Sequence, residues 1–75
     1  SVNYSNQVTE NKVKEAIDML NIFADTIKST ISELEEQIKK KEDGEIKRTF
    51  ELFLDMEISR IYVIEEIIRK LESDE

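Results

Sequence analysis

The sequence predicts an all-α protein, an antiparallel hairpin of two long helices that dimerises into a four-helix bundle. Three observations lead to this fold. Apolar residues follow heptad spacing in the first half, the only glycine comes directly after that half, and the segment beyond it is apolar on most sides. We expect the 75 residues to form a single domain, 1–75, or half of one, because a chain this short buries too little surface to be comfortably stable alone.

Apolar residues recur in the first half of the chain at alternating gaps of four and three. This spacing places them along one continuous seam on a helix. Exposed positions carry opposite charges one turn apart, as in Glu10 with Lys14. The pattern predicts a helix from about residue 6 to about residue 42, with Ser5 or Thr9 as its N-cap. The seam consists of Val13, Ile17, Leu20, Ala24, Ile27, Ile31, Leu34 and Ile38.

Asp43 and Gly44 interrupt this pattern. On a helical wheel, the apolar stripe after Gly44 is centred roughly 100° away from where the first helix would carry it, so one straight helix would bury the wrong side. We therefore expect a tight turn at 43–44 and an antiparallel second helix from about 44 to about 73, with Asp43 as its N-cap. A continuous helix with a one-residue skip is the alternative.

The second helix is apolar on more sides than one partner helix can cover. A second hairpin is therefore implied, as a homodimer or higher homo-oligomer, and two-fold symmetry is the commonest way to supply it. The residues expected in the core and dimer contact are Phe50, Phe53, Leu54, Ile61, Ile64, Ile68 and Leu71. The same stripe includes Ile46 and Ile67, and further apolar surface comes from Leu52, Met56, Ile58, Tyr62 and Val63. Tyr4 and Tyr62 are expected to be packing or rim residues.

Composition excludes several kinds of chemistry. The chain has no Cys and no His, which rules out a Ser-His-Asp triad, a thiol redox centre, a haem axial His and a zinc finger. Eighteen acidic residues against eleven basic ones give a net charge of −7, which disfavours direct nucleic-acid binding. No apolar stretch approaches the roughly 20 residues of a membrane span. We expect a cytoplasmic protein that is not an enzyme and needs no cofactor.

Glu57 and Arg60 depart from the apolar pattern of the second helix. Glu57 falls near the centre of the apolar stripe, and Arg60 falls toward its edge. A buried carboxylate needs a partner, since an unpaired buried charge costs many kcal/mol. Their spacing lets the two side chains pair within one helical turn. We expect a buried ion pair that fixes the register or the choice of partner.

The second helix also carries a set of sequence motifs. It opens with Asp43-Gly44-Glu45-Ile46, contains Phe50 and Phe53, and continues with Met56-Glu57-Ile58-Ser59-Arg60 and Ile64-Glu65-Glu66-Ile67-Ile68. From Asp43 to Leu71 the chain resembles the second helix of a rubrerythrin-type, ferritin-like hairpin. The resemblance implies a helical hairpin and a Glu-x-x-His motif whose Glu and His bind a di-iron site.

Glu57 matches the ligand Glu of that motif, but Arg60 stands where the His should be. The seam of the first helix contains no carboxylate, and its acids Asp18 and Asp25 lie on the solvent side. Without the His and without a first-helix Glu, an ordinary di-iron centre cannot be assembled. The resemblance supports the architecture and not the family's chemistry.

Acidic residues also gather around the predicted turn. They are able in principle to coordinate a hard cation such as Mg²⁺, but they lack the fixed spacing of a calcium loop, so a solvated end of the hairpin is the better interpretation. These residues are Glu33, Glu35, Glu36, Glu42, Asp43 and Glu45.

Two functional hypotheses follow. The first is a non-catalytic, acidic interaction or scaffold protein that acts as a homodimeric helical bundle and binds an unidentified partner protein. The alternative is a ferritin-like metal-binding or metal-storage module, with Glu57 as its candidate ligand at the bundle core. We favour the first, because no pair of convergent metal ligands is visible within one chain.

Overall fold

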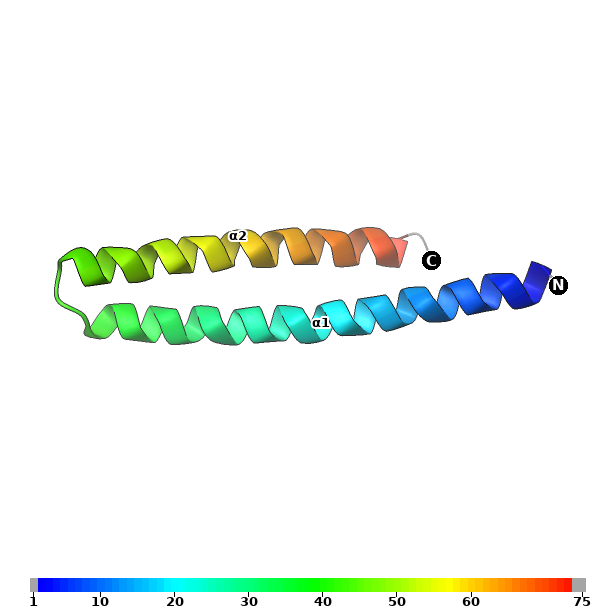
Figure 1. The fold of residues 1–75 in the computed structure, drawn as a ribbon, viewed down its shortest axis with the longest axis horizontal. Helices are drawn as coiled ribbons and strands as arrows, with labels where there is room; N and C mark the ends of the chain where they lie inside the picture. Colours follow the sequence, from blue (N-terminus) through cyan, green and yellow to red (C-terminus); the bar gives the residue numbers. More distant parts are fainter. Residues whose placement is uncertain (1, 74–75) are drawn as a thin grey trace.

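The computed structural model describes the backbone of residues 2–73 and the side chains of residues 7–73. It contains two helices, α1 (Val2–Lys40) and α2 (Glu45–Ser73). They lie antiparallel and side by side (Figure 1). Because α1 has 39 residues and α2 has 29, the amino-terminal part of α1 runs past the end of α2. An all-α hairpin is therefore confirmed for the described part of the chain.

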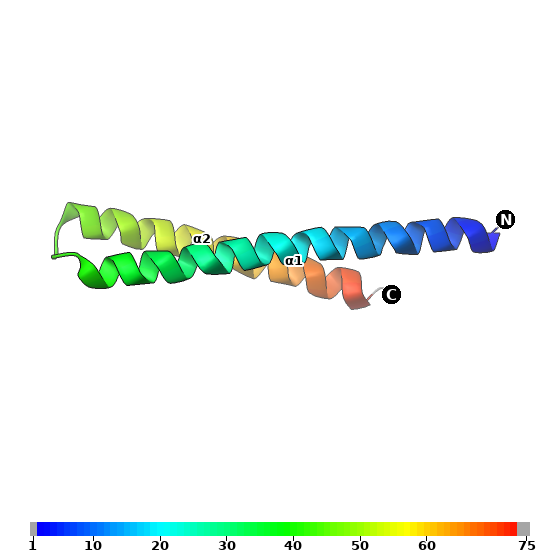
Figure 2. The same cartoon turned by 90° about the horizontal axis from the view of Figure 1, so that it is seen from below.

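The hairpin is long and thin. It measures 63 × 14 × 13 Å, and its radius of gyration is 17.9 Å. A globular chain of this length has a radius of gyration of about 11 Å. Figure 2 shows that the two helices cross as they run along each other, as expected where heptad spacing keeps one seam facing the partner helix. The contact between the helices is therefore a narrow strip along each of them.

The start of α1 differs from the prediction. The helix begins at Val2, before the expected start at about residue 6, and the predicted caps Ser5 and Thr9 both lie inside it. Neither Pro nor Gly occurs before Gly44, so no strong helix breaker stops the helix near those residues. The prediction for Tyr4 concerns a side chain outside those that the structure describes.

The turn between the helices spans residues 41–44. The Gly44 carbonyl accepts a hydrogen bond from the Arg48 N–H at 3.1 Å, which makes Gly44 the N-cap of α2. The prediction that Asp43 caps this helix is wrong. Its carboxylate instead accepts a hydrogen bond from Lys47 Nζ at 3.1 Å. Glycine takes the cap because the backbone here has a φ of 159°, which residues with a side chain rarely adopt.

The core lies along the seam between the helices. Ala24 and Ile27 of α1 and Ile61 of α2 are among its buried residues. The buried set is Ile17, Ala24, Ile27, Ile61 and Ile68, and the half-buried residues packed against it are Val13, Leu20, Ile31, Ile64 and Leu71. The α1 residues among them all belong to the predicted heptad seam, so this seam faces α2.

The expected core residues of α2 divide into two groups. Ile61 and Ile68 are buried, and the half-buried ones are Phe50, Leu54, Ile64 and Leu71. Phe53, by contrast, is exposed, as are Ile46 and Ile67 of the same predicted stripe. Phe53 is therefore no part of the hairpin core, because a single neighbouring helix is too narrow to cover the whole stripe.

We predict that Ile27→Ala lowers the free energy of unfolding by about 2 to 5 kcal/mol, the usual loss for a buried isoleucine. Ile27 is 2% exposed, whereas Ile22 on the same helix is 68% exposed and serves as the control. Ile22→Ala should change the free energy of unfolding by less than about 0.5 kcal/mol. Urea denaturation at one fixed protein concentration measures both, and equal losses would show that the seam is placed wrongly.

Candidate functional site

Glu57 and Arg60 form an ion pair on α2. Arg60 Nη1 donates a hydrogen bond to Glu57 Oε1 at 2.8 Å, and the spacing of three residues places both side chains on one side of the helix. The Glu57 side chain is 18% exposed and that of Arg60 is 49% exposed. The structure thus brings the two residues together. In a single hairpin the guanidinium still faces water, so burial of the pair stays a prediction that depends on a second hairpin.

Phe23 of α1 completes this group. The guanidinium carbon of Arg60 lies 5.4 Å from the centroid of the Phe23 ring, within cation–π range. Arg60 therefore contacts both the Glu57 carboxylate on its own helix and an aromatic ring on the other helix. Sequence reasoning missed Phe23 because it lies outside the heptad seam of α1. The available signal was its position directly before the seam residue Ala24.

Exposed apolar side chains extend well beyond this group. Among the residues with described side chains, twelve large hydrophobic residues are exposed, whereas five hydrophobic residues are buried. The exposed set is Val8, Met19, Ile22, Phe23, Ile46, Leu52, Phe53, Met56, Ile58, Tyr62, Val63 and Ile67. Eight of the twelve belong to α2, which agrees with the expectation that this helix is apolar on several sides. The four from α1 were not identified from the sequence.

Other ion pairs lie on the surface. Lys28 Nζ lies 3.1 Å from Glu65 Oε2 and links the two helices. Arg69 donates a hydrogen bond to the Glu66 carboxylate. This hydrogen bond and the charge of Arg69 lower the pKa of Glu66, and Glu66 raises the pKa of Arg69 in the same way. Exposed pairs of this kind add little to stability.

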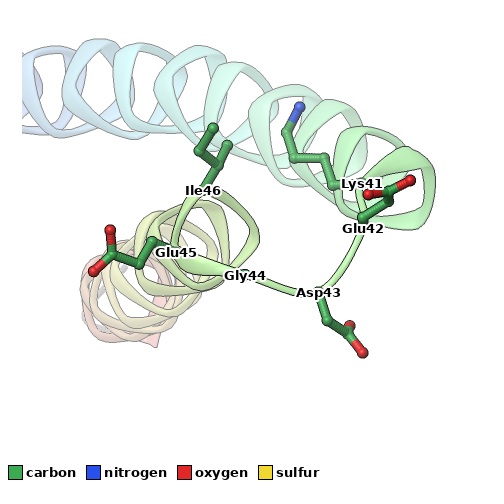
Figure 3. Close-up of a pocket in the computed structure, with 6 residues that line it drawn as sticks. All are labelled: Lys41, Glu42, Asp43, Gly44, Glu45 and Ile46. Carbon is green, nitrogen blue, oxygen red and sulfur yellow. The ribbon is translucent and has the colours of Figure 1, made fainter.

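The acidic residues around the turn do not converge. Figure 3 shows that the carboxylates of Asp43 and Glu45 point to different sides of the turn, while Ile46 points toward α1. The Lys41 ammonium lies 4.4 Å from the centroid of the Phe50 ring. In the part of the chain that the structure describes, no group of three or more Asp or Glu residues is placed to hold a metal ion. Glu57, the candidate metal ligand, belongs to no such group, and its carboxylate accepts a hydrogen bond from Arg60.

No protein-family model, no curated protein and no solved structure matches this chain. The resemblance to a rubrerythrin-type hairpin therefore rests on the residues of α2 and stays a prediction from the sequence.

We predict that Arg60→Leu lowers the free energy of unfolding of the assembled protein by about 3 to 5 kcal/mol if a second hairpin covers the pair, because Glu57 is then left buried and unpaired. If the pair stays half-exposed, the loss should be about 1 kcal/mol or less. The double change Glu57→Leu with Arg60→Met should cost much less than the single change, since no charge is stranded.

The control is Arg69→Leu, which removes an exposed pair of the same spacing on the same helix. It should change stability by less than about 0.5 kcal/mol. Chemical denaturation at fixed protein concentration measures all the variants, because folding and association are linked. A small loss for Arg60→Leu, equal to that of the control, would show that the pair is exposed in the assembled protein.

Proposed function

We propose that this chain is a non-catalytic interaction or scaffold protein that works as a homodimeric four-helix bundle and presents an acidic surface to a partner protein. The observation that carries the proposal is the number of large apolar side chains that the hairpin leaves in water, twelve against a buried core of five in the described part. Single exposed hydrophobic residues are ordinary, but large contiguous apolar surfaces mark interaction sites.

The contact between Glu57 and Arg60 supports a structural role for these two residues. The Glu57 carboxylate accepts a hydrogen bond from Arg60. An arginine side chain offers only donors and is not a metal ligand. A cation at Glu57 would have to compete with the guanidinium that already neutralises it. The metal-binding alternative is therefore weaker than the interaction hypothesis. Once a second hairpin covers it, this ion pair instead serves the register or the choice of partner.

The net charge bears on the choice of partner. At −7, the chain is repelled by phosphate backbones and attracted to proteins with basic surfaces. In addition, none of the described helices combines the length and the apolar character that crossing a membrane requires. We propose that the partner is a protein that meets the charged surface of the bundle.

We predict a dimer that dissociates only together with loss of helical structure, because the apolar surface of α2 has nothing else to cover it in an isolated hairpin. Sedimentation equilibrium gives the mass, and circular dichroism at the same concentrations gives the helicity. A cooperatively folded monomer that persists at low micromolar concentration would contradict the proposal.

We also predict no measurable affinity for duplex DNA or RNA at physiological salt. Contacts to phosphates need clustered Lys and Arg, and the chain carries an excess of seven negative charges. A fluorescence anisotropy titration with a labelled duplex tests this. Salt-sensitive binding at or below about 1 μM, tighter than ordinary non-specific contacts, would show that assembly creates a basic patch.

A further inference from the structure

The hairpin has two broad faces, one on each side of the seam. On each helix, the residue directly before a seam residue lies about 100° to one side, and the residue directly after it lies about 100° to the other. Because α1 and α2 are antiparallel, the preceding residues of both helices share one face. Two contacts agree with this. Phe23 and Arg60 both precede buried residues and meet each other, whereas Lys28 and Glu65 both follow seam residues and meet each other.

The face made by the preceding residues, called here the Phe23 face, carries few charges and many apolar side chains. Four of its sixteen residues are charged, namely Lys12, Glu33, Arg60 and Lys70. The face consists of Lys12, Ala16, Met19, Phe23, Thr26, Thr30, Glu33 and Gln37 of α1 and Ile46, Thr49, Phe53, Met56, Arg60, Val63, Ile67 and Lys70 of α2. These residues repeat the heptad gaps of the seam beside them. Each helix thus carries a second stripe, which is the wider pattern of helices that pack on two neighbours in a bundle.

The threonines of the Phe23 face are already satisfied within their own helices. The hydroxyls of Thr26, Thr30 and Thr49 donate to the backbone carbonyls four residues earlier, at 3.1, 3.1 and 2.9 Å. A hydroxyl that loses water without gaining a partner costs about 1 to 3 kcal/mol. Covering this face therefore leaves none of these hydroxyls without an acceptor.

The opposite face, called here the Lys28 face, is highly charged and acidic overall. It consists of Lys14, Asp18, Asn21, Asp25, Lys28, Ser32, Glu35 and Lys39 of α1 and Arg48, Glu51, Asp55, Ile58, Tyr62, Glu65, Arg69 and Glu72 of α2. Two copies of a chain with a net charge of −7 repel each other through such a surface. The Lys28 face is therefore suited to water or to a basic partner.

We propose that a second copy of this chain docks on the Phe23 face, which leaves the Lys28 face on the outside of the dimer. This assignment rests on the proposed homodimer and adds which surface forms it. The hairpin exposes 6074 Å², whereas a globular monomer of 8.8 kDa exposes about 4,800 Å². The excess of about 1,300 Å² is larger than the roughly 800 Å² per partner that a standard stable interface buries.

Charge and spacing select a second copy as the occupant. The lone guanidinium of the Phe23 face is paired with Glu57, so a dimer through this face buries a neutral pair and brings few acids together. The stripes of an identical hairpin have the same heptad spacing, which suits packing of helix against helix. A strongly basic partner, by contrast, would bind the acidic Lys28 face.

The test compares two substitutions on α2 that differ in the face they occupy. Val63 lies on the Phe23 face and is 56% exposed in the single hairpin, and Ile58 lies on the Lys28 face and is 46% exposed. Val63→Lys should weaken the dimer by at least about 100-fold, because it places an unpaired ammonium in the contact. Ile58→Lys should change the dissociation constant by less than about threefold. Sedimentation equilibrium measures both.

A second measurement covers the case in which Val63→Lys fails to fold. The chain has no cysteine, so Val63→Cys and Ile58→Cys each introduce a single thiol. As the protein concentration rises through the dissociation constant, alkylation of the thiol at 63 should slow by at least about tenfold, and alkylation at 58, which stays partly exposed in the folded dimer, should slow by less than about threefold. Protection at 58 and not at 63 would overturn the face assignment while the homodimer stands. A monomeric, folded wild-type protein would overturn both.

Discussion

A helix in contact with one other helix has only one side covered, and this limit governs the whole hairpin. The seam of α1 meets α2 along a strip centred on Ala24, Ile27 and Ile61. Everything outside this strip stays in water, however apolar it is. The long shape, the small core and the large exposed apolar surface all follow from the same cause, since residues 2–73 contain no third element to place against either helix.

Much of the hairpin was predictable because its signals are local. The heptad gaps around Ile27 fix the seam, and a single glycine in 75 residues fixes the turn. Local signals do not separate the hairpin core from the apolar surface beside it, because tertiary geometry decides that division. Phe53 shares a broad apolar stripe with true core residues, and only the width of α1 determines which of them it covers. The N-cap prediction failed for a local reason. The backbone φ at position 44 is 159°, which favours glycine, so Gly44 and not Asp43 is the N-cap of α2.

The contacts of Arg60 show the same difference between local signals and tertiary geometry. The contact between Glu57 and Arg60 follows from their spacing on one helix and was expected from the sequence. The contact between Arg60 and Phe23 joins two helices, so it depends on how far the turn shifts one helix along the other. Sequence spacing within a helix carries no information about that shift. Phe23 became visible only once the register between α1 and α2 was known.

The short turn at residues 41–44 also shapes how the chain folds. The described long-range contacts all join α1 to α2, so once the turn closes, each further contact extends the seam without closing a new large loop. Such a topology zips from the turn toward the open end and is typical of fast folding. The last contacts to form are those farthest from the turn, at the end of the core that contains Val13, Ile17 and Leu71. The same end should open first, and its amide hydrogens should exchange with solvent before those near the turn.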